Sequence, residues 1–447
     1  MTIDNNTATL PSSFNELGLI TPLLARLTDL QYQQPTPIQA QTIPSILAGR
    51  DLIAGANTGS GKTATFALPL LQQLFNEKSS GQTSSNASKK GNYVAGLVLV
   101  PTRELATQVA DSIRSYAAHL NGAVKTVAVF GGVSTNKQML TLRGGTDILV
   151  ATPGRLLDLI SSNAIKLDHV KTLVLDEADR MLSLGFTEEI SALLAMMPKQ
   201  KQTLLFSATF PEQVKTLTTE LLNNPVEVQV QSADASTLVQ RVFTVNKGQK
   251  TVSLAHLIKE NQWRQVLVFV NSKSGCAHLA SKLAKHDINA EVFHGDQAQG
   301  ARNRVLQAFK DGEIEVLIAT DIAARGLDIE KLPVVFNFDL PRSPADYMHR
   351  IGRSGRAGEI GLALSLIDYE DFHHFKIIEK KNKFRLEREE IAGFEIDESL
   401  IDPNFSVHKP VVPAAGSGKK KRAKKASKSE STIYQDIWSG NLNSDSK

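Results

Sequence analysis

Short apolar runs recur along the chain, and each ends in a polar or glycine-containing turn. In the first half these runs cover residues 96–102, 126–132, 147–155, 172–179 and 203–209. In the second half they cover residues 266–272, 290–296, 316–321, 334–339 and 362–368. Continuous β-branched runs of this length are typical of strands buried on both faces, as in a parallel sheet. The pattern therefore predicts parallel strands in both halves of the chain.

Amphipathic segments lie between the apolar runs, for example at residues 103–120 and 274–286. Strands that alternate with helices predict βαβ units. Because the alternation occurs twice, we expect two α/β domains, each with a mostly parallel sheet flanked by helices. A polar stretch without strong periodicity marks the join, which places the domains at residues 12–231 and 241–396 with a linker at 232–240.

Three other segments lack this alternation. Residues 1–11 are expected to be a disordered N-terminus, and residues 78–92 a surface loop inserted after a helix. The pattern decays after about residue 396, and the composition from Pro410 onward is typical of disorder. We therefore expect residues 397–447 to form a disordered tail.

Composition narrows the class of protein. A chain of 447 residues suits two domains plus extensions, and 41% hydrophobic with 21% charged residues is typical of soluble globular proteins. No apolar run approaches the roughly 18 residues that a membrane span needs, and the N-terminus lacks the pattern of a secretion signal. Cys276 is the only cysteine, which excludes an internal disulfide and a cysteine-based metal site. A cytoplasmic protein is expected.

The net charge of +4 is distributed unevenly. Residues 419–428 carry seven cations and no acid, whereas the rest of the chain is close to neutral. Such a tail can attract phosphate without sequence preference, so we expect it to tether nucleic acid, with Tyr434 and Trp438 as stacking groups downstream. The alternative is a solvated charge run without a role.

Polar signatures follow the expected strands directly, at the end where open α/β sheets bind ligands. Residues 56–63, "ANTGSGKT", lie between a short apolar piece and a helical run. Gly59 and Gly61 let the backbone N–H groups face a phosphate, Lys62 would reach the β- and γ-phosphates, and the Thr63 hydroxyl would take Mg²⁺. Ala56 stands where the strict pattern has glycine. The alternative is a glycine-rich turn before a helix. The nucleotide-binding set in this loop is Ala56, Asn57, Thr58, Gly59, Ser60, Gly61, Lys62 and Thr63.

Residues 173–179, "LVLDEAD", place two adjacent carboxylates at the end of an apolar strand. There Asp176 can hold Mg²⁺, directly or through water, while Glu177 orients the attacking water. An acidic cluster in this position on its own is more often a helix N-terminal cap. Its combination with the phosphate loop favours hydrolysis of a nucleoside triphosphate.

From about Phe14 to about Asp368 these motifs resemble the DEAD-box RNA helicase family of superfamily 2, which implies two tandem RecA-like domains. "PTPIQ" at 35–39 resembles the motif that reads adenine, with the Gln39 amide as donor and acceptor and Phe14 as the upstream aromatic. The family usually has Gly-Phe where this chain has Gln31 and Tyr32; the tyrosine keeps the aromatic surface.

The resemblance also implies roles for other residues of the first half. It assigns the coupling of hydrolysis to strand separation to Asp179, to the "SAT" motif (Ser207, Ala208 and Thr209) and to His349 of the second half. Contacts to the RNA backbone fall to Pro101, Thr102, Arg103, Gly131, Gly132, Thr152, Pro153, Gly154 and Arg155, groups that suit phosphate and ribose and do not read bases. Arg103 and Arg155 could instead be ordinary surface or salt-bridge arginines.

In the second half the resemblance implies RNA contacts at Asn271, Gly295, Gln299, Arg302, Thr320 and Asp321. It also implies nucleotide contacts at Gly326 and Asp328. "HRIGRSGRAG" at 349–358 has no phosphate loop of its own nearby, and the family pattern assigns Arg353 and Arg356 to the γ-phosphate as arginine fingers. Guanidinium suits this role because its planar fork bonds phosphate in two places.

The implied activity is that of an ATP-dependent RNA helicase. It would use ATP and Mg²⁺, bind single strands and short duplexes through their backbone, and unwind locally or remodel ribonucleoproteins. We expect a monomer, with partners in RNA decay or ribosome assembly. "FNELGL" and the basic tail resemble the RhlE-like bacterial group. Two alternatives stay open: an ATP-gated RNA clamp without productive unwinding, and a DNA translocase of the same superfamily.

Overall fold

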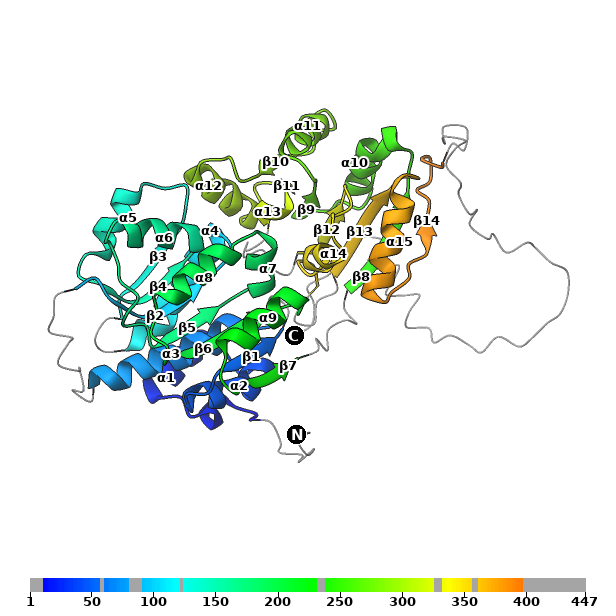
Figure 1. Ribbon diagram of the computed structural model, residues 1–447. Coiled ribbons are helices and arrows are strands. Elements are labelled where there is room, and N and C mark those ends of the chain that lie inside the picture. Colours follow the sequence, from blue (N-terminus) through cyan, green and yellow to red (C-terminus); the bar gives the residue numbers. More distant parts are fainter. Residues whose placement is uncertain are drawn as a thin grey trace, which may run out of the picture. The chain divides into compact units, whose positions relative to one another are not determined.

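The computed structural model describes residues 11–56, 60–79, 91–120, 124–230, 238–324, 332–355 and 361–396. The chain divides into two compact units, unit 1 before and unit 2 after about residue 236 (Figure 1). Strand β8 begins at Leu238, so the last three residues of the predicted linker belong to a strand. The predicted N-terminal and C-terminal disorder and most of the predicted surface loop lie outside the described residues.

Unit 1 is built on a seven-stranded parallel sheet in the order β3-β4-β2-β5-β6-β1-β7. The five strands predicted from apolar runs are present. The strands are β1 (Leu52–Gly55), β2 (Val94–Leu99), β3 (Thr126–Val129), β4 (Thr146–Ala151), β5 (Thr172–Leu175), β6 (Gln202–Ser207) and β7 (Val226–Gln229). Every residue of β5 is buried, as expected for a strand covered on both faces.

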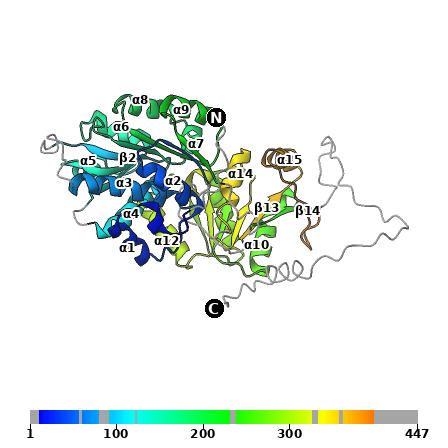
Figure 2. The same ribbon diagram turned by 90° about the horizontal axis from the view of Figure 1, so that it is seen from below.

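Helices cover both faces of this sheet, and Figure 2 shows the two layers. One apolar core lies under η1 (Phe14–Leu17), α1 (Thr21–Asp29), α2 (Pro37–Leu47), α3 (Lys62–Ser79) and α4 (Arg103–Tyr116). The other lies under α5 (Thr135–Leu142), α6 (Pro153–Ser161), α7 (Ala178–Ser183), α8 (Thr187–Ala195) and α9 (Glu212–Leu221). A short helix, η2 (Ala117–His119), follows α4.

Unit 2 has a second seven-stranded parallel sheet, in the order β10-β11-β9-β12-β13-β8-β14. Its strands are β8 (Leu238–Thr244), β9 (Val266–Phe269), β10 (Ala290–Phe293), β11 (Val316–Ala319), β12 (Val334–Asn337), β13 (Gly361–Ile367) and β14 (Arg388–Glu389). Its helices are η4 (Lys247–Gln249), α10 (Lys250–Glu260), α11 (Lys273–Ala284), α12 (Gln299–Lys310), α13 (Asp321–Ala324), α14 (Pro344–Ile351) and α15 (Asp371–Asn382).

The two sheets share one topology. When the strands of each unit are counted from its first strand, both sheets have the order 3-4-2-5-6-1-7. The prediction of two α/β domains with parallel sheets is confirmed. Ligand groups at the carboxyl ends of the strands can therefore be compared between the units position by position. Among the helices of the described residues, none is both long and apolar enough to cross a membrane.

Candidate functional site

The described part of the phosphate loop lies at the carboxyl end of β1 and at the first turn of α3. Gly61 has φ +91°, and a Cβ at this position would lie 2.5 Å from Gln39 Nε2, so both the conformation and the space require glycine. The Ser60 carbonyl accepts a hydrogen bond of 2.8 Å from Thr36 Oγ1. Asn57, Thr58 and Gly59 lie outside the described residues.

Lys62 is the first residue of α3, and its side chain is buried. Its ammonium nitrogen has no hydrogen-bond partner among the described residues. A buried charge without a partner is costly. Positive charge at a helix N-terminus that is already electropositive adds to this cost, and a phosphate group relieves both. The position therefore fits the phosphates of a nucleotide.

Asp176 follows β5 and is 3% exposed. Burial raises the pKa of Asp176 to about 6; the charge of Lys62 opposes this effect, and the neighbouring Glu177 carboxylate adds to it. One Asp176 oxygen accepts the Glu177 N–H at 3.0 Å. Glu177 is the N-cap residue of α7, but its side chain makes no capping hydrogen bond. A divalent cation between this carboxylate and a phosphate would offset the cost of burying both anions.

Gln39 is 3% exposed and holds the phosphate loop to α2. Its Oε1 accepts the Thr36 N–H at 2.9 Å, and its Nε2 donates to the Gly61 carbonyl at 3.2 Å. Both ends of the amide are therefore used within the protein. A role in reading adenine requires one of these bonds to be exchanged, and it stays a prediction.

Phe14 and Tyr32 lie together beside this region, with ring centroids 6.4 Å apart. Tyr32 is 41% exposed and its hydroxyl lies 3.2 Å from that of Tyr116. Gln31, which replaces the glycine usual in the family, has φ +58°. The turn therefore keeps the left-handed conformation that favours glycine, although the residue is glutamine.

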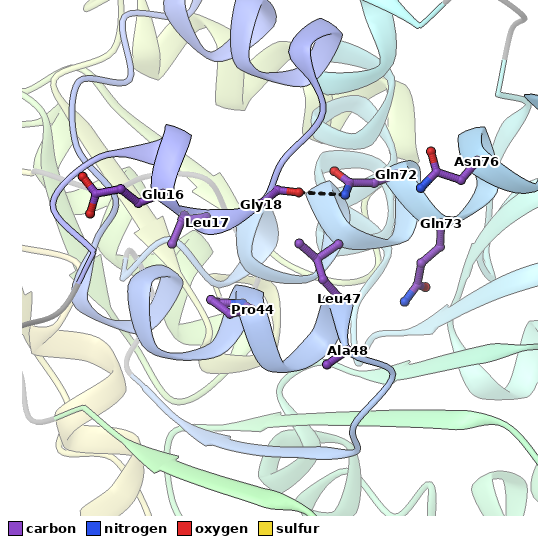
Figure 3. Close-up of a pocket in the computed structure, with 9 residues that line it drawn as sticks. All are labelled: Glu16, Leu17, Gly18, Pro44, Leu47, Ala48, Gln72, Gln73 and Asn76. Carbon is purple, nitrogen blue, oxygen red and sulfur yellow. Dashed lines mark hydrogen bonds between the residues drawn. The ribbon is translucent and has the colours of Figure 1, made fainter. Parts of the chain in front are cut away.

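Gln72 fastens the segment that carries Phe14 onto α3. Its Nε2 donates to the Gly18 carbonyl at 2.9 Å and its Oε1 accepts the Ile20 N–H at 2.8 Å. Beside this link lies a cavity of about 440 Å³ between η1, α2 and α3, drawn in Figure 3. The three elements that carry Phe14, Gln39 and Lys62 thus pack directly on one another.

The predicted coupling residues of unit 1 form one hydrogen-bonded cluster. Asp179 Oδ2 accepts bonds from the Thr209 N–H at 3.0 Å and the Thr209 hydroxyl at 2.6 Å. Ser207 Oγ accepts the Asp179 N–H at 3.3 Å and donates to the Thr209 carbonyl at 2.6 Å. Because Asp179 is three residues beyond Asp176, this cluster ties the end of β6 to the predicted metal site. His349 lies in unit 2, on α14.

The predicted RNA contacts of unit 1 follow β2, β3 and β4, which are neighbours in the sheet. Thr102 caps α4 by accepting the Leu105 N–H at 3.3 Å, and Thr152 is the N-cap residue of α6 with Pro153 next to it. A Cβ on Gly132 would lie 2.0 Å from Arg103 Nη1, so the arginine lies against the glycine backbone. Gly131 and Gly154 have open space beside them.

Arg155 supports this edge from within unit 1. Its Nη1 donates to the Val133 carbonyl at 3.0 Å and to Gln138 Oε1 at 2.9 Å, and Gln138 in turn donates to the Phe130 carbonyl. The guanidinium therefore holds the loop that contains Gly131 and Gly132. Arg155 thus has a structural role within unit 1, and its contact to the RNA backbone stays a prediction.

The predicted RNA contacts of unit 2 follow β9, β10 and β11, the equivalent strands of the second sheet. Gly295 has open space beside it, and Thr320 is largely buried. Gln299 and Arg302 lie in the first turn of α12, where the Arg302 guanidinium stacks on the Phe293 ring at 4.6 Å. Gly326, Asp328 and Arg356 lie outside the described residues.

Arg350 is an organising residue that sequence reasoning missed. Its buried guanidinium contacts both oxygens of Asp321 (2.6 and 2.7 Å), Asn271 Oδ1 (3.1 Å) and Asn337 Oδ1 (3.1 Å). Asn271 also donates to the Leu340 carbonyl at 2.9 Å. Two predicted RNA contacts, Asn271 and Asp321, are therefore fixed by one arginine of the "HRIGRSGRAG" motif. Arg353 is also buried in unit 2.

The equivalent of Lys62 in unit 2 is Lys250, the first residue of α10, which follows the first strand of its sheet. Its ammonium pairs with Asp371 at 2.6 Å and Asp368 at 3.1 Å. Lys250 is thus neutralised by carboxylates of its own unit, whereas the Lys62 ammonium has no hydrogen-bond partner among the described residues. This contrast supports the prediction that the phosphate loop of unit 1 binds the nucleotide.

Comparisons with known proteins agree with this division. Residues 36–217 match the DEAD/DEAH box helicase family, and residues 249–358 match the helicase conserved C-terminal domain. The ATP-dependent RNA helicase DeaD of Escherichia coli is 39% identical over 387 residues, 86% of this chain, and the match spans 59% of DeaD. The helicase CshA of Bacillus cereus is 39% identical over 391 residues, 87% of this chain and 71% of CshA.

A similar solved structure is that of Dbp5 from Saccharomyces cerevisiae bound to RNA and ADP BeF3. It has a TM-score of 0.73 and 29% sequence identity, and the match covers 85% of this chain and 96% of that chain. The RhlE-like subgroup stays a prediction, since these relatives are named DeaD and CshA. One helicase family match lies in each unit, unit 1 contains the phosphate-loop and "DEAD" motifs, and CshA is 39% identical over 71% of its length. The chain therefore belongs to the DEAD-box ATP-dependent RNA helicase family.

Proposed function

We propose that the chain is an RNA-stimulated ATPase that unwinds short RNA duplexes locally or remodels ribonucleoproteins. The observation that carries this proposal is the buried Lys62 ammonium at the N-terminus of α3, which has no hydrogen-bond partner among the described residues. The buried Asp176 carboxylate at the end of β5 supports it. A positive and a negative group, both buried and at the ends of strands, suit the phosphates and the cation of a bound nucleotide.

In this proposal Lys62 binds the β- and γ-phosphates, and Thr63 and Asp176 hold Mg²⁺, partly through water. The ion would neutralise charge that develops on the phosphate oxygens. Glu177 orients the attacking water, while Gln39, Phe14 and Tyr32 bind the adenine. Arg353 and Arg356 stabilise the transferring phosphoryl group. Asp179, Ser207 and Thr209 couple hydrolysis to strand separation. Their hydrogen bonds connect the ends of β5 and β6.

RNA would lie on the carboxyl ends of β2, β3 and β4 in unit 1 and of β9, β10 and β11 in unit 2. The groups offered there are glycine backbone, threonine and arginine, which suit phosphate and ribose, so binding should tolerate any sequence. ATP and RNA should each tighten the binding of the other, because both favour the same state. We further propose a monomer in the cytoplasm with partners in RNA metabolism.

RNA-stimulated ATP hydrolysis is the decisive measurement. Lys62→Ala should abolish it, whereas Lys78→Ala should leave it unchanged, because Lys78 lies at the far end of the same helix and its ammonium pairs with Asp147 at the surface. Activity of Lys62→Ala comparable to that of Lys78→Ala would refute the proposal.

Two further assays separate the alternative functions. Strand displacement of a short RNA duplex distinguishes a helicase from an ATP-gated clamp, which would hydrolyse ATP without releasing a strand. Stimulation by RNA and not by DNA of the same sequence distinguishes it from a DNA translocase.

A further inference from the structure

The second half of α15 exposes a concentration of positive charge. Within residues 376–385 the chain has five cations, and all five side chains are exposed. We call Lys376, Lys380, Lys381, Lys383 and Arg385 the α15 basic surface. Helix α15 lies at the side of unit 2 formed by β8, β13 and β14 (Figure 1).

Helix geometry places these side chains together. With about 100° between successive residues, Lys376, Lys380, Ile377 and Lys381 fall within an arc of about 140° on the helix surface. The opposite arc contains Phe375 and Ile378, which are buried in the core beneath. Ile377 is 40% exposed in the middle of the cationic arc. This arc therefore combines three positive groups and one apolar contact.

The only acid of residues 376–385 is turned inward. Glu379 is 7% exposed and accepts hydrogen bonds of 2.9 Å from Arg388 Nη1, Arg388 Nη2 and the Leu386 N–H. The Glu379 carboxylate is thus paired with Arg388 and not with the neighbouring lysines. Within the described parts of the chain, Lys376, Lys380, Lys381 and Lys383 form no ion pair. By contrast, Glu370 and Asp371 at the start of α15 pair with Lys247 of η4 and Lys250 of α10.

Helix stability alone does not account for this arrangement. Cations in the last turn interact favourably with the helix dipole, which covers Lys380 and Lys381. Lys376 is one turn earlier, and Lys383 and Arg385 lie beyond the end of the helix. Like charges four residues apart, such as Lys376 and Lys380, destabilise a helix. The surface is therefore retained at a cost, which an anionic ligand would offset.

We propose that the α15 basic surface binds the phosphate backbone of RNA that extends beyond the core binding site. This rests on the proposed function, since it takes RNA as the substrate. Helix α15 follows the carboxyl end of β13 and runs back to β14, which is parallel to β8. The cations at its C-terminal half therefore lie toward the amino ends of the strands, away from the groups at the carboxyl ends of β9, β10 and β11.

The consequence is a footprint that depends on RNA length. An RNA that fills only the core site leaves the α15 basic surface without a ligand, whereas a longer strand engages both. Single-strand sites on compact domains span roughly 4–16 nucleotides. A uridine oligomer of about 10 nucleotides should test the core site, and one of about 40 nucleotides should test both sites.

The test compares Lys376→Gln/Lys380→Gln with Lys282→Gln/Lys285→Gln in the full chain. In the control pair, Lys282 lies on α11 of the same unit and Lys285 is the C-cap residue of that helix. Both are exposed, and their substitution removes the same number of charges. Binding of both fluorescent oligomers is measured across a salt series with a non-hydrolysable ATP analogue. Loss of two contacts to single-stranded phosphates should lower the slope of log K against log salt by about 1.4. This should occur for the long oligomer and the α15 variant only.

Equal slopes for the two variants with the long oligomer would overturn the proposal, and would indicate an acidic protein partner or a solvated surface. A weaker slope with the short oligomer as well would also overturn it, because the residues would then belong to the core site. The unaltered chain provides the separate check of the proposed function: if it neither binds RNA nor shows RNA-stimulated turnover, both proposals fail, whereas normal turnover with equal slopes rejects this one alone.

Discussion

Gln31 has a backbone conformation that glycine adopts at lower cost. Its φ of +58° lies in the left-handed region, and its N–H donates to the Thr28 carbonyl at 2.9 Å as α1 ends. The left-handed conformation costs a residue with a Cβ about 1–2 kcal/mol, and glycine loses about 0.5–1 kcal/mol through its greater freedom in the unfolded chain. Gln31→Gly should therefore raise the free energy of unfolding of unit 1 by roughly 0.5–1 kcal/mol.

Urea unfolding of unit 1, followed by circular dichroism, would measure this difference. Gln34→Gly is the matched control: it makes the same substitution in the same connection, at a residue without positive φ. It should lower stability, because only the entropy term applies. If both substitutions lower stability equally, the backbone of Gln31 is not strained.

At the residue scale, the sequence predicted where some side chains lie but not which partners they bond. The locations of Lys62 and Asp176, two predicted ligand residues, were predictable because each follows a strand end. The hydrogen-bond partners of Arg155 and Arg350 were not predictable, because the two guanidinium groups bond to residues 11 to 79 positions away in the sequence. Nothing in the spacing of "HRIGRSGRAG" distinguishes an arginine that organises unit 2 from one that faces a ligand.

At the scale of elements, a partly buried ion pair between Arg388 and Glu379 connects β14 to α15. Arg388 donates two bonds of 2.9 Å to Glu379, and its guanidinium lies 4.7 Å from the centre of the Phe375 ring. Burial would raise the pKa of Glu379, but the hydrogen bonds from Arg388 and the Leu386 N–H outweigh it and lower the pKa. A carboxyl with a lowered pKa stabilises the fold fully above its ordinary pKa, about 4.3. This contribution is lost as the pH falls through the lower value of the folded state.

Glu379→Gln should therefore destabilise unit 2 at pH 7, and the difference from the unaltered protein should shrink as the pH falls below about 4. Trp263, which packs against Phe336 in unit 2, reports unfolding by fluorescence in a Trp438→Phe background. Glu387→Gln is the control, since Glu387 is exposed on the same connection. A difference between the two variants that does not depend on pH would contradict the ionic anchor.

Apolar runs predicted the interior strands β2, β4, β5, β6, β9, β11, β12 and β13 and also the edge strands β3 and β10, whereas the edge strands β7 and β14 were not predicted. All ten predicted strands have an apolar run, and β9 and β12 are buried at every residue. β7 alternates half-buried and exposed residues, and β14 is two residues long. A strand with so few buried side chains leaves little signal in composition. β8 was placed partly in the linker because its first four residues are only half-buried.

At the scale of the whole molecule, one topology carries two different charge arrangements. The Lys62 ammonium in unit 1 has no hydrogen-bond partner among the described residues, whereas its equivalent Lys250 pairs with Asp368 and Asp371. Unit 1 is therefore expected to capture the nucleotide alone. The sequence predicted this asymmetry from the missing glycine-lysine pattern in the second half, but the carboxylates that replace the ligand were visible only in the structure.

Because unit 1 is expected to bind the nucleotide, we predict that the arginines of unit 2 act in hydrolysis and contribute little to ATP binding. If Arg356 acts on the transferring phosphoryl group, Arg356→Ala should lower RNA-stimulated turnover by about 10³-fold or more while ATP affinity changes little, because arginine fingers act mainly in the transition state. Arg356→Lys should restore little, since an ammonium cannot bridge two phosphate oxygens.

Cys276 supplies the control for folding: burial raises the pKa of its thiol to about 12, so an intact unit 2 should resist alkylation at pH 8. Near-normal turnover of Arg356→Ala, with Cys276 still protected, would show that the arginine serves RNA or structure and not the phosphate.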